Sequence, residues 1–219
     1  MEAMKLRVLG TGMVGQAIAS KLVALGHEVK MGSRTANNEK AVAWAVAAGG
    51  KASTGTFAEA AAHGRIVFNC TNGRGTMPAL NAAGAENLRD KVLVDVSVPL
   101  DFSKGMPPCL FTASGESLGE EVQRAFPSTR VVKTLNTINA SVMVDPGKVD
   151  DGNHDVFVCG NDTAAKTQVT AILRDWFGWK RIHDFGDITG ARATEGYLLF
   201  WLRAWSTLGT AAFNIRLVR

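Results

Sequence analysis

A strand, a glycine-rich turn, a helix and a second strand follow one another without interruption between residues 7 and 34. The first strand is predicted from LRVLG and the second from HEVKM. The helix between them carries Ile18, Leu22 and Leu25 at spacings of four and three residues, and Gly26 ends it. A strand that enters a helix through a glycine turn and returns as a strand is typical of the α/β class.

The chain continues this alternation as far as residue 137. Three further stretches, RIVFNC, KVLVDVSVP and RVVKTLNT, are nearly continuous apolar runs, as expected of strands buried on both faces. We therefore predict a Rossmann-like, doubly wound parallel sheet. The pattern changes beyond residue 138, so we expect a first domain of residues 1–137 and a smaller C-terminal part of residues 138–219, which ends in an apolar helix near residues 189–208.

The glycine turn matches the pattern G-x-G-x-x-G between a clear strand and a clear helix. Its glycines permit a tight turn, close approach of the backbone to a pyrophosphate, and close packing of helix against strand. The N-terminus of the helix also offers free N–H groups and the positive end of a dipole. The residues expected to contact a dinucleotide here are Gly10, Thr11, Gly12, Met13, Val14 and Gly15.

The end of the second strand departs from the usual dinucleotide-binding pattern. An acidic residue there commonly accepts hydrogen bonds from a ribose 2′-hydroxyl, but this chain has Ser33 followed by Arg34. A carboxylate would repel a 2′-phosphate, whereas a hydroxyl and a guanidinium can hold one. We therefore predict that residues 1–137 bind NADP rather than NAD, with a solvated loop arginine as the alternative interpretation of Arg34.

Three loops that follow later strands form the rest of the predicted site. In an open parallel sheet, ligands bind at the carboxyl ends of the strands, near the point where the strand order reverses. Asn136 or Asn139 could hydrogen-bond a nicotinamide carboxamide, although asparagine also ends strands for local reasons. The candidate residues in these loops are Thr71, Asn72, Gly73, Ser97, Pro99, Asn136 and Asn139.

Composition narrows the classes of partner. The formal net charge of +4 is modest and comes without a dense Lys/Arg run, so no nucleic-acid surface is expected. The longest apolar runs are too short to span a bilayer, which favours a cytoplasmic protein. The last helix is apolar around most of its circumference and must be covered by a cleft or by a partner subunit, so a homodimer is expected.

The other chemically capable side chains are expected to be structural. The odd number of cysteines, without metal-ligand spacing, fits a reducing compartment, and each cysteine is expected to be buried as a small hydrophobe: Cys70, Cys109 and Cys159. The histidines stand in separate elements, without metal spacing or a serine–acid partner: His27, His63, His154 and His183. Arg192 and Glu195 lie three residues apart on the last helix and are expected to pair. No metal site and no catalytic protein residue are therefore predicted.

Several longer segments carry a resemblance to a known family. They are GTGMVG, GSR, VVKTLNT, FVCGND at residues 157–162, and the ending GDITGAR…FNIRLVR. Over nearly its whole length the chain resembles the F420-dependent NADP oxidoreductase family. This resemblance implies hydride transfer between NADPH and the deazaflavin coenzyme F420, with both rings stacked in a cleft between the dinucleotide domain and the C-terminal part.

The resemblance also implies roles for individual positions. It assigns the pyrophosphate turn to Thr11, Met13 and Val14, the 2′-phosphate to Ser33 and Arg34, and the neighbourhood of the reacting rings to Asn136, Ile138 and Asn139. Membrane ferric reductases have a similar cytosolic domain that passes hydride to a flavin, so a flavin or ferric acceptor is the alternative second substrate.

Direct hydride transfer between two aromatic carriers requires positioning more than protein chemistry. The donor carbon and the acceptor atom must lie about 3–3.5 Å apart with water excluded, and no protein acid or base is needed. Two other functions remain open. A dehydrogenase acting on a small carbonyl or imine would need a proton donor, for which Lys133 is the candidate. A non-enzymatic NADP sensor would bind the cofactor tightly and pass no hydride.

Overall fold

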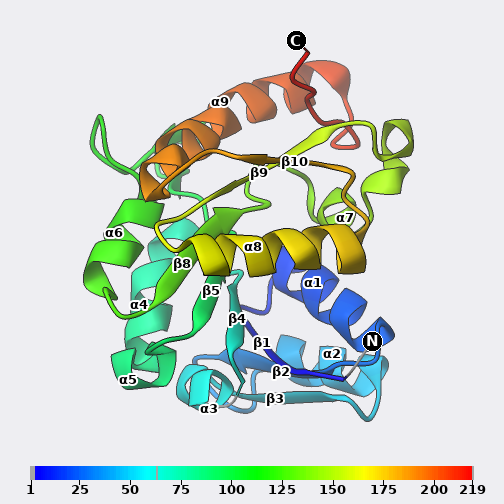
Figure 1. Ribbon diagram of the computed structural model, residues 1–219, viewed down its shortest axis with the longest axis vertical. Coiled ribbons are helices and arrows are strands. Elements are labelled where there is room, and N and C mark those ends of the chain that lie inside the picture. The colour runs from blue at the N-terminus through cyan, green and yellow to red at the C-terminus, as the bar shows by residue number, and fades with distance from the viewer. Residues whose placement is uncertain (1–2, 63, 219) are drawn as a thin grey trace.

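The computed structural model describes residues 3–62 and 64–218, and its main sheet has eight strands in the order β10-β9-β8-β5-β4-β1-β2-β3 (Figure 1). The bounds of these strands are Lys5–Leu9 (β1), Glu28–Ser33 (β2), Ala52–Thr56 (β3), Ile66–Asn69 (β4), Val92–Asp95 (β5), Arg130–Thr134 (β8), Asp155–Cys159 (β9) and Arg181–Asp184 (β10). A separate hairpin pairs Leu100–Asp101 (β6) with Cys109–Leu110 (β7). The Rossmann-like α/β fold predicted from the sequence is confirmed.

Helices cover both faces of the sheet. The longer ones are Met13–Ala24 (α1), Glu39–Ala48 (α2), Gly73–Ala83 (α4), Leu118–Ala125 (α6), Thr163–Ala171 (α8) and Ala191–Leu208 (α9). The shorter ones are Phe57–Ala62 (α3), Ala85–Leu88 (α5), Ala140–Met143 (α7), Pro146–Lys148 (η1), Asp150–Gly152 (η2), Ile172–Phe177 (η3) and Ile188–Gly190 (η4). One core lies under α1, α2, α7, α8 and η3, and a second core lies under α3, α4, α5 and α6.

The strand order reverses at β1. From β1 the chain moves through β2 to β3 on one side, and then returns to place β4 on the other side of β1. The strands β2, β1, β4, β5 and β8 are all parallel, so their carboxyl ends share one edge of the sheet. Ligands of open α/β sheets bind at such a reversal, between the loops that follow β1 and β4.

The last two strands run against the others. β8 and β9 are antiparallel, with Thr134 opposite Val158, and β10 is parallel to β9. A parallel connection needs a crossover that returns the chain to the opposite edge of the sheet. Only the four-residue α7 and two short 3-10 turns separate β8 from β9, so the chain re-enters from the edge it has just left. The division of the chain at residue 137 stays a prediction, since β9 and β10 extend the same sheet.

The helix α9 packs on one side only within the single chain. Leu198, Trp201 and Leu202 form a small core with the hairpin and with the segment after α9. Phe200 and Leu208 are 61% and 59% exposed. Coverage by a second copy therefore stays a prediction, which sedimentation of the wild type and of Phe200→Asp would test. Within the described ranges, no helix combines the length and the apolarity that crossing a membrane requires.

Candidate functional site

The glycine turn after β1 is fastened to both neighbouring strands. The Gly10 N–H donates to the Gly32 carbonyl oxygen at 3.0 Å. On the other side, the Cys70 N–H donates to the Leu9 carbonyl oxygen at 2.8 Å. Gly10 has a φ of +114°, and a Cβ atom there would lie 2.7 Å from the Cys70 carbonyl oxygen. Both the positive φ and the lack of space for a Cβ atom require glycine at position 10. The turn is also bonded to Gly32, the residue that precedes Ser33.

The N-terminus of α1 is open. Gly12 is its N-cap, no side chain caps it, and no acidic residue stands in its first turn. A Cβ atom on Gly12 would meet no described atom within 4 Å, and Met13 is 75% exposed. The first N–H groups of a helix have no intrahelical acceptor, so they point outward with the positive end of the helix dipole. An anionic group such as a pyrophosphate fits this opening.

Ser33 and Arg34 stand at the carboxyl end of β2, beside this turn. Ser33 is buried, and its hydroxyl donates to the Thr35 carbonyl oxygen. Arg34 is exposed and forms no ion pair with any part of the chain that the structure describes. Ser33 therefore shapes the loop, and Arg34 is the cation at this position that can meet an anionic group.

The loops after β4 and β5 contact each other. A Cβ atom on Gly73 would collide with the Val98 carbonyl oxygen and would lie 2.9 Å from the Pro99 Cα atom. Asn72 caps α4, because its side chain accepts from the Gly75 N–H at 2.7 Å. The absence of a side chain at Gly73 thus lets the two loops share one surface.

A chain of hydrogen bonds under these loops joins the ends of β4 and β5. The Thr71 hydroxyl donates to the Asn69 side-chain oxygen at 2.7 Å. Asn69 in turn donates to the Asp95 carboxylate at 2.8 Å. The same carboxylate oxygen accepts from the Ser97 hydroxyl at 2.8 Å and from the Ser97 N–H at 3.2 Å. Thr71 and Ser97 are therefore held by a shared acid.

Lys133 completes this buried network. Its Nζ lies 2.8 Å from Asp95 Oδ2 and 2.8 Å from Glu195 Oε1, with no exposed side-chain area on the lysine. It also donates to the Ser97 carbonyl oxygen at 2.6 Å. Burial opposes the charge on Lys133, but the two carboxylates outweigh burial and raise the pKa of Lys133 above its usual value. A lysine held in this way positions a loop and does not supply a proton to a substrate.

The pairing expected between Arg192 and Glu195 is wrong. Arg192 pairs with Glu120 at 2.6 Å, and Glu195 accepts from two N–H groups at the start of α6 besides pairing with Lys133. Those N–H groups are free because they lie at a helix N-terminus. The role of Glu195 could not be predicted because its partners are distant in the sequence. Its i,i+3 spacing predicted a pair with Arg192 instead.

The loop after β8 holds two asparagines in different states. Asn139 caps α7, accepting from the Ser141 N–H at 2.9 Å and from its hydroxyl at 2.8 Å. Asn136 is 3% exposed, and its Nδ2 finds no hydrogen-bond partner among the described residues. Ile138, between them, is buried. A buried amide without an acceptor is costly, so the Asn136 Nδ2 is a donor that the described residues leave unsatisfied.

The strand order brings the predicted residues to the carboxyl edge of the sheet, because β2, β1, β4, β5 and β8 are neighbours. Two hollows of the surface lie elsewhere, and neither is lined by residues of these loops. Among the residues that the structure describes, no three histidine, cysteine or acidic side chains could hold a metal ion. His63 lies outside the described residues. Cys70 and Cys159 are buried as predicted, but the prediction for Cys109 is wrong, because it is exposed on the short β7 hairpin strand.

Comparison with known proteins adds to this geometry. Residues 5–99 match the model of the family described as NADP oxidoreductase, coenzyme F420-dependent. The chain is 31% identical to the F420-dependent NADP reductase of Methanothermobacter marburgensis, covering 88% of each chain. It is 48% identical to a candidate F420-dependent NADP reductase from Arthrobacter sp. FB24, whose crystal structure it matches with a TM-score of 0.95 over 99% of this chain and 100% of that one.

A membrane-enzyme relative shares only part of its length with this chain. The chain is 30% identical to the rat metalloreductase STEAP3 over 93% of its own length, but it spans only 38% of that protein.

Proposed function

Because the chain belongs to the F420-dependent NADP reductase family, we propose that it transfers hydride between NADP(H) and coenzyme F420. One observation carries the NADP part of the proposal. The open N-terminus of α1 lies in a turn that is hydrogen-bonded to Gly32, and the next two residues are Ser33 and Arg34. A helix N-terminus that would bind a pyrophosphate is thus tied to the strand end whose cation would bind a 2′-phosphate, with no acid at the end of β2.

The residues present fit the cofactor. The N–H groups at Met13 and Val14 would bind the pyrophosphate, and the Arg34 guanidinium would bind the 2′-phosphate. Asn136 would donate its unpaired amide N–H to the carboxamide oxygen of the nicotinamide. When bound, the reduced nicotinamide supplies the hydride.

The chain contributes orientation and exclusion of water to this reaction. Thr71, Gly73 and Ser97 would form the floor under the cofactor, because the network around Asp95 fixes the loops that carry them. Ile138 and Pro99 are buried beside these loops and would keep water from the reacting atoms. No described side chain is needed to move a proton, which agrees with a hydride passing directly between two carriers.

Loss of NADPH absorbance in the presence of F420 tests the proposal. We expect rapid oxidation of NADPH and slow oxidation of NADH. FMN, FAD and ferric chelates are run beside F420 as acceptors. Binding of NADPH without turnover of any acceptor would contradict the proposal and would favour an NADP sensor.

A substitution at Arg34 tests the assignment of the 2′-phosphate. A hydrogen bond to a charged group is worth about 1.5–3 kcal/mol, so Arg34→Gln should raise the KM for NADPH by about ten- to a hundredfold and leave the KM for NADH unchanged. Arg124→Gln is the matched control, since Arg124 is exposed on α6, away from β2. Equal KM changes for the two nucleotides would show that Arg34 does not read the phosphate.

The similarity to the rat metalloreductase supports a second candidate acceptor. In this alternative, the same NADP site passes hydride to a flavin, which then reduces ferric iron. The two candidates differ only in the second substrate, so the acceptor panel separates them. Turnover with FMN or FAD that exceeds turnover with F420 would select the flavin reaction.

A further inference from the structure

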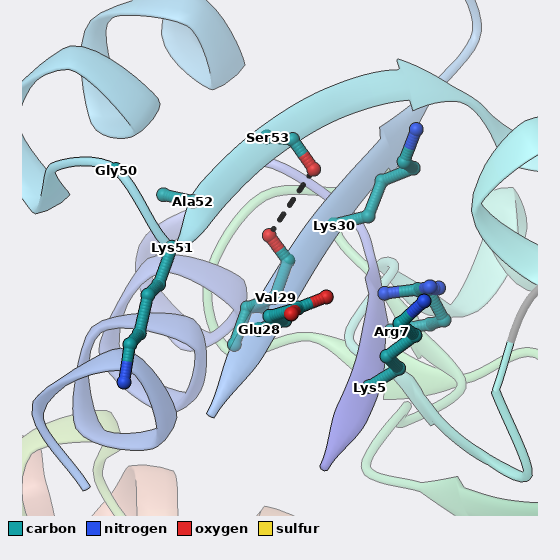
Figure 2. A pocket seen from close by; sticks show the side chains of 9 residues that line it. All are labelled: Lys5, Arg7, Glu28, Val29, Lys30, Gly50, Lys51, Ala52 and Ser53. Atoms are coloured by element: carbon teal, nitrogen blue, oxygen red, sulfur yellow. Dashed lines mark hydrogen bonds between the residues drawn. The ribbon is translucent and has the colours of Figure 1, made fainter. Parts of the chain in front are cut away.

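A basic hollow lies at the amino ends of β1, β2 and β3, at the opposite edge of the sheet from the cofactor loops (Figure 2). Its volume is about 340 Å³, and its polar lining includes Lys5, Arg7, Glu28, Lys30, Lys51 and Ser53. In Figure 2, Lys5 and Arg7 lie together beside β1, the Glu28 carboxylate extends from β2 toward them, and Lys51 extends away. Lys51 is already engaged, because its Nζ donates to the Gly26 carbonyl oxygen at 2.8 Å.

The register of the strands concentrates positive charge on one face. Lys5 is paired in register with Glu28, and Arg7 with Lys30. Like charges that are directly opposite each other on adjacent strands repel. Among residues 3–62 and 64–218, no ion pair is formed by Lys5, Arg7 or Lys30. Three cations thus line the hollow with one carboxylate, and none of the three forms an ion pair within the described residues. Lys30 also lies close enough to Glu59, outside the lining, to lower its pKa.

Arg7 is the unusual member of this group. It is only 5% exposed, its Nη1 donates to the Leu6 carbonyl oxygen at 2.7 Å, and its Nε finds no partner among the described residues. Burial lowers the pKa of Arg7, with Glu28 acting in the opposite direction. Burial and repulsion from Arg7 also lower the pKa of Lys91. A buried guanidinium whose Nε lacks a partner among the described residues, and which has cationic neighbours, favours the binding of an anion.

We propose that this hollow binds the phosphate group of a small molecule. The Arg7 guanidinium would donate from its free Nε, and Lys5 and Lys30 would supply the remaining positive charge. The volume is close to the lower end of small-molecule sites, so an inorganic phosphate or a short phosphate ester fits and a nucleic acid does not. Glu28 would accept from a hydroxyl of the ester, which favours a sugar phosphate over the free ion.

Calorimetric titration of the NADP-saturated protein tests this proposal, because the saturated cofactor site cannot take up the probe. Inorganic phosphate and ribose 5-phosphate are titrated separately, with ribose as the uncharged control. We expect both phosphates to bind, the ester more tightly, and ribose not to bind. Binding of inorganic phosphate as tight as that of the ester would leave the phosphate site standing and would reject Glu28 as a hydroxyl acceptor. Absence of heat with both phosphates at millimolar concentration would overturn the proposal.

Substitutions locate the bound phosphate. Arg7→Met keeps the volume of the side chain and removes its donors, so it should weaken phosphate binding by about tenfold or more. Glu28→Gln removes the repelling carboxylate and should tighten binding of inorganic phosphate by about threefold. Lys40→Met is the control, because Lys40 is exposed on α2 outside the hollow. Phosphate binding that is unchanged in Arg7→Met would place the phosphate elsewhere and overturn the proposal.

A stability measurement separates a ligand site from a structural role of Arg7. The thermal midpoint of Arg7→Met without phosphate should equal or exceed that of the wild type, because the substitution removes a buried charge that forms no ion pair with the described residues. Added phosphate should raise the midpoint of the wild type and not that of Arg7→Met. A large fall in the midpoint of Arg7→Met in phosphate-free buffer would instead show that Arg7 holds the fold together.

Discussion

Lys133 and Arg7 are basic side chains on inner strands of the same sheet, at 1% and 5% exposure. In the strand register, Lys133 is paired with Asp95, whereas Arg7 is paired with Lys30. At the carboxyl edge, two carboxylates and a carbonyl oxygen therefore surround the buried cation. At the amino edge, the Nε of the buried guanidinium has no hydrogen-bond partner among residues 3–62 and 64–218. A cation satisfied by the chain organises loops, whereas a cation left unsatisfied favours an external anion.

The largest expected effect comes from removing Lys133, the buried cation at the carboxyl edge that the chain satisfies. Lys133→Met leaves the Asp95 and Glu195 carboxylates buried without their cation, which should lower the free energy of unfolding by about 3–5 kcal/mol. The loop that carries Ser97 also loses its anchor, so the KM for NADPH should rise. Urea unfolding of Lys133→Met beside Arg7→Met measures the contrast. Similar stability losses in the two variants would contradict the distinction between the two edges.

Removing one carboxylate from the same network should cost less. Glu195→Gln keeps an amide oxygen that can accept from one of the two α6 N–H groups, and Lys133 keeps Asp95. We expect a loss of about 1.5–3 kcal/mol in urea unfolding, the range for hydrogen bonds to charged groups. Glu121→Gln, on the helix α6 whose N–H groups Glu195 binds, is the control and should change stability little. A loss in Glu195→Gln no larger than in this control would show that Lys133 needs only Asp95.

One substitution gives Arg7 the kind of cross-strand partner that Lys133 has. Lys30→Glu places a carboxylate in register with Arg7, as Asp95 is with Lys133. Opposite charges on adjacent strands contribute about 0.2–1 kcal/mol. Lys30 also attracts Glu59, whose pKa it helps to lower, and Lys30→Glu turns that attraction into repulsion, so the urea midpoint should change little. The same change should abolish phosphate binding, because the hollow would hold two acids. Lys40→Glu controls for the altered net charge, and phosphate binding that persists in Lys30→Glu would show that the hollow is not the site.

The predictable part of the site is the part built from neighbouring residues. The turn at Gly10, the open helix start at Gly12 and the pair Ser33–Arg34 all follow from residues within one strand–helix–strand unit, where spacing determines geometry. Helix caps such as Asn72 and Asn139 are equally local, although whether a capping asparagine also meets a ligand cannot be decided from spacing.

The unpredictable part depends on which distant elements meet. The sequence makes Lys133 a candidate proton donor, but no residue near it in the sequence indicates its pairing with Glu195 on the last helix. The reversal of direction at β9 depends in the same way on the connection that follows β8. The apolar pattern of a buried strand does not indicate the direction in which it runs. The basic hollow could not be predicted either, because only the register of β1 with β2 brings together Lys5, Arg7, Glu28 and Lys30.

The smallest expected effect concerns a second tie between α6 and α9, this time near the surface. Arg192 lies 2.6 Å from Glu120, with 49% and 15% of their side chains exposed. The hydrogen bond from Arg192 holds the pKa of Glu120 below its ordinary value of 4.5. A carboxyl group whose pKa is lower in the folded protein stabilises the fold at pH values above the pKa of the unfolded chain. This contribution disappears as the pH falls through the pKa of the folded protein.

Because the pair is partly solvated, Glu120→Gln should cost about 0.5–1 kcal/mol at neutral pH. The difference from the wild type should shrink below pH 4.5. Urea unfolding from about pH 7 to about pH 3 measures this difference. A difference that stays constant over that range would mean that Glu120 acts through packing and not through its charge. The hydrogen bonds from the Leu118 and Gly119 N–H groups to the buried Glu195 carboxylate would then be the electrostatic tie between the two helices.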